Sequence, residues 1–70
     1  MIGEEIRKAR KAAGLSQEQL AFRAGVTRNY VSMVELSQAS PTLDTLFKIC
    51  HAMNVKAATL VARIERTMDS

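Results

Sequence analysis

Apolar and polar positions along this chain follow the period of amphipathic α-helices, with apolar residues recurring three and four positions apart. The pattern predicts five short helices, over residues 2–13, 17–24, 28–36, 43–53 and 57–67. The most regular stripe lies in the fourth helix and predicts the centre of the core: Leu43, Leu46, Phe47, Cys50 and Met53. Strand-like alternation does not occur, so we expect an all-α fold of five helices in a single domain over residues 1–70.

Polar residues between the stripes predict where the helices begin and end. Ser16 is followed three positions later by Gln19, the spacing of a capping box, and Thr27 can cap the third helix. Gly25 allows the left-handed backbone of a tight turn between these two helices, and Asn54 is a plausible left-handed stop after the fourth. Two short helices joined by a glycine-containing turn describe a helix-turn-helix over residues 15–35.

The net charge of +3 indicates an anionic partner, and the distribution of the charge says more than its sum. Residues 1–30 carry six basic and three acidic side chains, whereas residues 31–70 carry four of each. The excess positive charge therefore lies in the half of the chain that holds the helix-turn-helix. A chain of 70 residues buries only a small core, so dimerisation would add to its stability.

The sequence does not indicate an enzyme, a metal site or a membrane protein. His51 is the single histidine and has no acidic or hydroxyl partner at a catalytic spacing, so we expect a helix surface residue and no enzyme. Cys50 and His51 are adjacent and point in different directions on a helix, which argues against a metal site. The lone cysteine and the lack of a secretory or membrane-length apolar run predict a cytoplasmic protein without a membrane partner. No effector domain is evident in the sequence, so we expect no cofactor and no small-molecule partner.

The runs GLSQEQLAFRAGVTRNYVSMVE and PTLDTLFKICHAMNV resemble the XRE-type helix-turn-helix family, which includes the DNA-binding domains of phage Cro and repressor proteins. The likeness covers residues 2–60. It implies a lambda-repressor-like fold and a transcriptional regulator that binds double-stranded DNA, with the helix over residues 28–36 in the major groove. The length and the run Leu-Ala-Phe-Arg-Ala-Gly are similar to the controller proteins of restriction–modification systems, although small phage repressors and antitoxins share most of the pattern.

Four residues on the outer side of the third helix are the candidates for base contacts: Arg28, Asn29, Ser32 and Met33. A helix docked in this way presents its N-terminal residues to base edges. A guanidinium matches guanine O6 and N7, an asparagine amide matches adenine N6 and N7, and a thioether can pack on a thymine methyl group. The alternative for each residue is an ordinary exposed position on a helix.

A second set of residues is suited to the DNA backbone: Gln17, Thr27, Tyr30 and Arg23. The resemblance places Gln17 against a phosphate at the start of the second helix, where free amides favour an anion. The ring of Tyr30 can pack on the domain while its hydroxyl reaches a phosphate, and simple packing is an equal alternative. The resemblance also implies a structural ion pair between Arg10 and Glu35, which would join the first helix to the end of the third.

Several positions depart from the family's pattern. Ser37 stands where relatives commonly have glycine, and a left-handed serine costs about 1 kcal/mol. Residues 38–40 carry no charge in a loop that is often basic, so we expect phosphate binding to be weaker or to shift to the first helix and Arg23. Phe22 and Leu36 stand where relatives are often polar, either as exposed apolar residues with a function or as cover for the edge of the core.

The demands of specific DNA recognition predict a dimer. One recognition helix reads about four base pairs at about 1–3 kcal/mol per mismatch, which barely distinguishes one site from its genomic competitors. Two helices about 34 Å apart on a palindromic operator suffice, so we expect a homodimer. The predicted interface lies on the last helix and comprises Leu60, Val61 and Ile64. The rival interpretation is a protein-interaction module such as an antitoxin or adaptor, but a docking helix normally presents apolar anchors.

Overall fold

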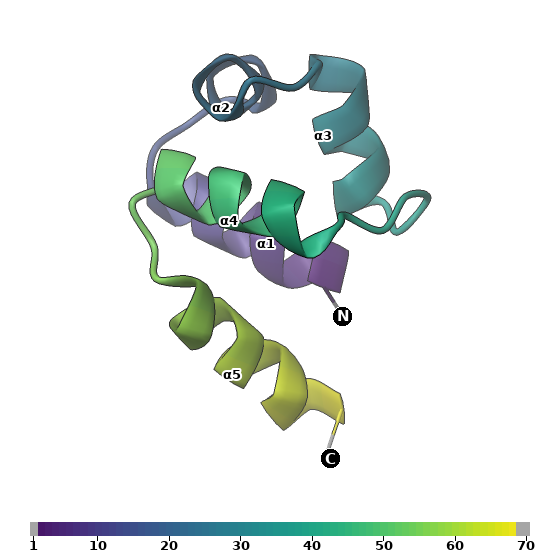
Figure 1. Cartoon of the computed structure of the whole chain (residues 1–70), viewed down its shortest axis with the longest axis vertical. Coiled ribbons are helices and arrows are strands. Elements are labelled where there is room, and N and C mark those ends of the chain that lie inside the picture. Colours follow the sequence, from purple (N-terminus) through teal and green to yellow (C-terminus); the bar gives the residue numbers. More distant parts are fainter. Residues whose placement is uncertain (1, 69–70) are drawn as a thin grey trace.

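Five helices make up the computed structural model, which describes residues 2–68 (Figure 1). They are α1 (Ile2–Ala12), α2 (Gln17–Ala24), α3 (Arg28–Glu35), α4 (Leu43–Ala52) and α5 (Ala57–Met68). Within residues 2–68 there is no strand, so the expected all-α class with five helices is confirmed. The helix ends differ from the predicted ones by one residue at most, and the outermost positions of the predicted domain, residue 1 and residues 69–70, lie outside the described residues.

Local hydrogen bonds explain where α2, α3 and α4 begin. The hydroxyl of Ser16 accepts from the Gln19 amide at 3.0 Å, while the Ser16 amide donates to Gln19 Oε1 at 2.9 Å, which completes the predicted capping box. Thr27 Oγ1 accepts from the amide of Tyr30 at 3.0 Å, and Thr42 caps α4 in the same manner. Each cap satisfies an amide that has no partner inside its helix.

Left-handed residues end the helices. Gly25 closes α2 with φ +71°, and its amide donates back to the carbonyls of Ala21 and Phe22. Asn54 follows α4 with φ 58°, as its sequence position predicted. Ser37 follows α3 with φ 61°, so a serine adopts the conformation that glycine adopts at little cost. The left-handed conformation that we expected at Ser37 is therefore present.

The helices pack around one core to which each of them contributes. α2 lies against α3 and α4, α1 lies against α3 and α5, and α5 also contacts α4. In Figure 1, α3 and α5 lie at opposite ends of the molecule. The largest fully buried side chains are Ile6, Leu20, Val31, Val34, Ile49, Cys50 and Leu60.

The predicted core stripe of α4 is only partly right. Leu46, Cys50 and Met53 are buried as expected, but Leu43 is 66% exposed and Phe47 is 51% exposed. Ile49 completes the buried arc instead. At 3.6 residues per turn, Phe47 lies about 100° around the helix from Leu46 and so falls on the flank. The apolar surface of α4 is wider than the part that α2 and α5 cover.

The start of α1 approaches the end of α3 very closely. A Cβ atom at Gly3 would overlap the carbonyl oxygens of Val34 and Glu35. Only glycine leaves room for this contact, so α1 supports the C-terminal end of α3 through backbone atoms. Among the described residues, none of the helices is both long and apolar enough to span a membrane.

Candidate nucleic-acid interface

The two sides of α3 differ sharply. Val31 and Val34 are buried and anchor the helix to the core. Arg28 and Asn29 are exposed in the first turn on the opposite side, and Ser32 and Met33 are half-buried one turn further along. The structure thus brings together, on the outer side of one helix, the four residues that the sequence suggested for base contacts.

The outer residues of α3 differ in how their polar groups are engaged. Asn29 Nδ2 donates to Met33 Sδ at 3.6 Å, across one helical turn. No described side chain binds the guanidinium of Arg28 or the hydroxyl of Ser32. The first turn therefore presents an unpaired guanidinium, with five donors in a planar fork, beside an amide whose oxygen accepts no bond from the described residues.

The residues suggested for phosphate contacts surround this face. Arg23 is exposed in the last turn of α2, and Thr27 is exposed at the N-cap of α3. Tyr30 is half-buried and packs against the edge of the core. Gln17 is half-buried in the first turn of α2, where its amide is already engaged by another side chain.

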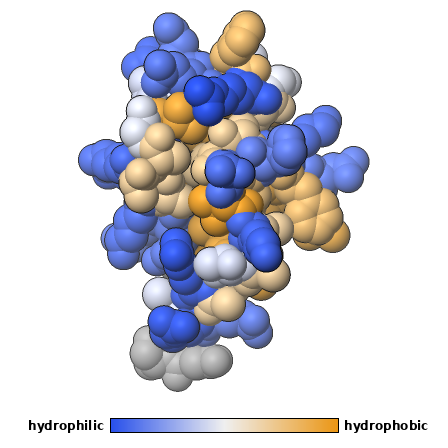
Figure 2. Space-filling view, turned by 90° about the vertical axis from the view of Figure 1, so that its left-hand side faces the viewer, coloured by the Kyte–Doolittle hydropathy of each residue, from blue (hydrophilic) through white to orange (hydrophobic). Residues whose placement is uncertain are grey.

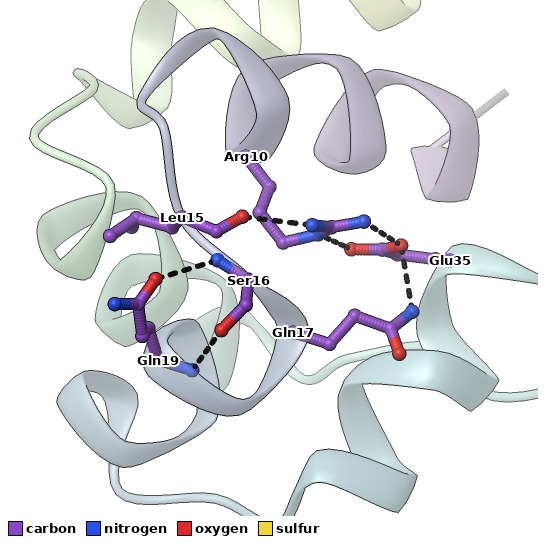
Figure 3. A network of polar contacts seen from close by, with 6 residues as sticks. All are labelled: Arg10, Leu15, Ser16, Gln17, Gln19 and Glu35. Carbon is purple, nitrogen blue, oxygen red and sulfur yellow. Dashed lines mark hydrogen bonds and ion pairs between the residues drawn. The ribbon is translucent and has the colours of Figure 1, made fainter.

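Figure 3 shows that partner, the carboxylate of Glu35. Gln17 Nε2 donates to Glu35 Oε1 at 3.1 Å. Arg10 donates to the same carboxylate through Nε, at 2.6 Å from Oε2, and through Nη2, at 3.1 Å from Oε1. Its Nη1 donates to the carbonyl oxygen of Leu15 at 2.8 Å. The ion pair implied by the family resemblance is therefore present, within a larger network.

This network fixes the relative positions of three helices. The side chain of Arg10 is 11% exposed and that of Glu35 is 2% exposed, so both charges are largely removed from water. Each is satisfied by a bidentate partner and one further hydrogen bond. Sequence reasoning missed the contact between Gln17 and Glu35, because the two residues are 18 positions apart and no local pattern links them.

Two large apolar residues are exposed, although the sequence allowed either exposure or burial at the edge of the core. Phe22 on α2 is 88% exposed, and Leu36 after α3 is 62% exposed. Neither covers the edge of the core, so that alternative is wrong. Glu18, Gln19 and Arg23 surround Phe22 on the outer face of α2.

The predicted dimer residues do not share one surface. Leu60 is fully buried in the core of its own protomer, so its assignment to an interface is wrong. Val61 is 38% exposed, and Ile64 is half-buried against the core. Phe47 on α4 is exposed although its stripe had been assigned to the core.

A hollow of about 420 Å³ lies where α4 gives way to α5. Its lining combines apolar and polar side chains: Phe47, Cys50, His51, Asn54, Val55, Lys56 and Ala57. Figure 2 views the molecule from the side on which the α4–α5 connection lies, and apolar side chains occupy the middle of that face with hydrophilic ones around them.

The titratable side chains form no metal site within residues 2–68, where no group of three or more His, Cys, Asp or Glu is placed to hold an ion. Cys50 is buried, and this burial raises the pKa of its thiol. The thiol therefore stays protonated and behaves as a small apolar core group.

The chain is similar to known helix-turn-helix proteins over most of its length. The profile of the Helix-turn-helix family matches residues 6–60. Control protein C.SmaI of Serratia marcescens is 36% identical over 63 residues, which cover 90% of this chain and 75% of C.SmaI. The restriction-modification controller protein C.AhdI from Aeromonas hydrophila matches with a TM-score of 0.81 and 39% identity, over 84% of this chain and 89% of C.AhdI.

A third similar protein has been solved with its ligand. The structure of SinR, the master regulator for biofilm formation, in complex with DNA matches with a TM-score of 0.79 and 37% identity, over 87% of this chain and 98% of the SinR chain. The names of these three proteins describe regulators, and none describes an enzyme. The family resemblance inferred from the sequence motifs is confirmed, and the chain belongs to the helix-turn-helix family of the XRE type.

Proposed function

We propose that this protein is a transcriptional regulator that binds a specific double-stranded DNA sequence as a homodimer, with α3 in the major groove. The observation that carries the proposal is the outer face of α3, where Arg28 and Asn29 are exposed on a helix anchored by buried valines. Helices of this motif present their N-terminal residues to base edges. The similarity to SinR, whose structure contains DNA, supports DNA as the partner here.

Each side chain on this face is suited to a different group on the DNA bases. Arg28 is suited to a guanine through a bidentate pair, and Asn29 to an adenine. Met33 offers an apolar contact, and Ser32 a short hydroxyl for a base edge that comes close to the helix. These assignments predict that changes at the four positions alter which sequence is bound.

Contacts with the DNA backbone hold α3 in register with the base pairs. Thr27 and Tyr30 lie at the start of α3 and Arg23 at the end of α2, within one motif. Gln17 keeps one amide hydrogen for a phosphate after donating the other to Glu35. The exposed Arg7 and Lys11 of α1 add positive charge in place of the uncharged loop after α3, whereas Lys8 pairs with Glu5 at 3.6 Å.

Selection of preferred sites from a random duplex pool tests the proposal, followed by anisotropy titration of the selected duplex at several salt concentrations. We expect a preferred palindromic site and a steep fall of affinity with salt, because each neutralised phosphate releases counterions. Arg28→Ala should reduce selectivity, whereas Arg63→Ala removes the same charge from exposed α5 and should leave it intact. Weak binding to every duplex alike would overturn the proposal.

We place the dimer contact on the face formed by α4 and α5. Val61 and Ile64 remain from the predicted interface, and Phe47 adds an exposed aromatic ring on the adjoining helix. Aromatic residues are enriched at such contacts. Phe47→Glu should shift sedimentation from dimer to monomer, whereas Phe22→Glu, on a different helix, should not. A wild-type monomer at tens of micromolar would contradict the dimer.

A protein-interaction module, such as an antitoxin or adaptor, is the second candidate. The observation that favours it is the exposure of Phe22 and Leu36, two large apolar side chains that the core does not require. The same titration separates the two functions, because an interaction module would show no sequence preference among duplexes. The polar outer face of α3 favours the regulator.

A further inference from the structure

Asn29 and Met33 contact each other on the outer face of α3. Asn29 Nδ2 donates to Met33 Sδ at 3.6 Å, and the two residues are one helical turn apart. We propose that they act as one reading unit, which selects an adenine followed or preceded by a thymine on the same strand. This inference rests on the proposed function, because it requires α3 to lie in the major groove.

The contact with sulfur determines which way the Asn29 amide faces. A thioether can accept a hydrogen bond but cannot donate one, so the amide nitrogen turns toward Met33 and the oxygen turns away. Without this partner the nitrogen and oxygen could exchange places by a simple rotation of the side chain. Met33 is therefore a positioning residue for Asn29.

The orientation leaves free the groups that adenine needs. Nδ2 has two hydrogens, and the sulfur takes one of them. The other hydrogen can bond adenine N7 while Oδ1 accepts from the N6 amino group. Guanine presents acceptors at both N7 and O6, so its O6 would face the amide oxygen. The preset amide thus favours adenine and disfavours guanine before DNA arrives.

The same orientation places Met33 over the neighbouring base. In the major groove, purine N7 and the thymine methyl group both lie on the side of the base edge nearest their own strand, while adenine N6 lies toward the paired base. When the nitrogen of the Asn29 amide lies at N7, Met33 lies beyond that nitrogen and therefore faces the strand that carries the adenine. The thymine methyl is the apolar group available there, and it matches the half-buried thioether side chain.

The test uses the full chain and the duplex preferred in the random-pool selection. Dissociation constants are measured for this duplex, for a copy with guanine in place of the adenine, and for a copy with deoxyuridine in place of the thymine. For the wild type we expect about a tenfold preference for adenine. Loss of one methyl contact should weaken binding about fourfold in the deoxyuridine duplex.

Two variants at one position separate the roles of the sulfur and of the apolar side chain. Met33→Leu keeps an apolar side chain of similar size and removes the acceptor, so the thymine preference should remain while the preference for adenine falls about threefold. Met33→Ala should lose both preferences. Asn29→Ala should abolish the preference for adenine whichever residue stands at position 33. Thermal melting of each variant establishes that it is folded.

Three results would overturn the inference while leaving sequence-selective binding intact. They are a full adenine preference in Met33→Leu, an unchanged affinity for the deoxyuridine duplex, and a preferred site that contains no adenine beside a thymine. The lack of any preferred site would instead overturn the proposed function. The two proposals therefore fail in different ways.

Discussion

Replacement of Arg10 by methionine tests how the buried network holds α3 in place. The change removes the guanidinium and keeps a long apolar side chain, but it leaves the Glu35 carboxylate with Gln17 as its remaining partner. The Glu35 side chain is only 2% exposed, so water cannot replace the lost bonds. Removing one member of a buried pair typically costs about 3–5 kcal/mol. The remaining bond from Gln17 places the expected loss near the lower end of that range.

The size of this loss matters because the protein is small. A domain of 70 residues has a free energy of unfolding of roughly 4–10 kcal/mol. A loss of about 3 kcal/mol should lower the melting temperature by on the order of 15 °C. Urea unfolding and thermal melting, both followed by far-ultraviolet circular dichroism, measure the two quantities directly.

Two further variants identify the cause of the loss. Arg7→Met removes the same type of charge from an exposed position on α1 and should change stability by less than about 0.5 kcal/mol. The double variant Arg10→Met with Glu35→Leu removes the stranded carboxylate and should recover about 2 kcal/mol relative to Arg10→Met alone. Equal unfolding midpoints for Arg10→Met and Arg7→Met would refute the reasoning. A double variant no more stable than Arg10→Met would show that the buried charge is not the cause.

Other consequences concern single positions. Gly3→Ala should cost about 2 kcal/mol in urea unfolding, because its Cβ meets backbone carbonyls of α3 that cannot move aside. Ser37→Gly should add about 0.5 kcal/mol by relieving the left-handed strain, and the same change at Ser40, which lacks a positive φ, should add nothing. Cys50 should react with a thiol reagent only as fast as the protein unfolds, so rapid labelling of the native state would contradict its burial. Because burial raises the pKa of the Cys50 thiol, the stability that this group contributes should be present below its ordinary pKa of 9.0 and be lost above it, where the thiol of the unfolded chain ionises first. The free energy of unfolding should therefore fall more steeply above that pH in the wild type than in Cys50→Ala.

The features that the sequence predicted well depend on neighbours along the chain. A capping box joins residues three positions apart, so Ser16 and Gln19 predict the start of α2 without knowledge of the fold. Gly25 and Asn54 end helices through their own backbone preferences. The polar and apolar sides of α3 also follow from its periodicity alone. These local rules explain why the helices and the polar outer side of α3 were correctly identified.

The features that the sequence did not predict depend on how the helices pack. Periodicity shows that α4 has an apolar side, but only the position of its neighbours decides that Ile49 is covered and Phe47 is not. Leu60 and Val61 are adjacent on α5, and their burial differs because the core lies on the side of Leu60. The bond between Gln17 and Glu35 joins two helices whose distance no sequence pattern specifies.

The arrangement of α3 separates the residues that hold the helix from those proposed to read DNA. Its C-terminal end is fixed by Glu35 and by the backbone contact with Gly3, whereas Arg28 and Asn29 extend from its first turn. Exposed residues in the first turn carry little of the packing energy, so they can change without loss of the fold. Recognition can therefore vary at one end of α3 while its direction is set at the other. A variant at Arg28 should bind DNA weakly even under conditions in which it is fully folded. A variant at Arg10 should instead regain wild-type DNA affinity under conditions in which it is fully folded.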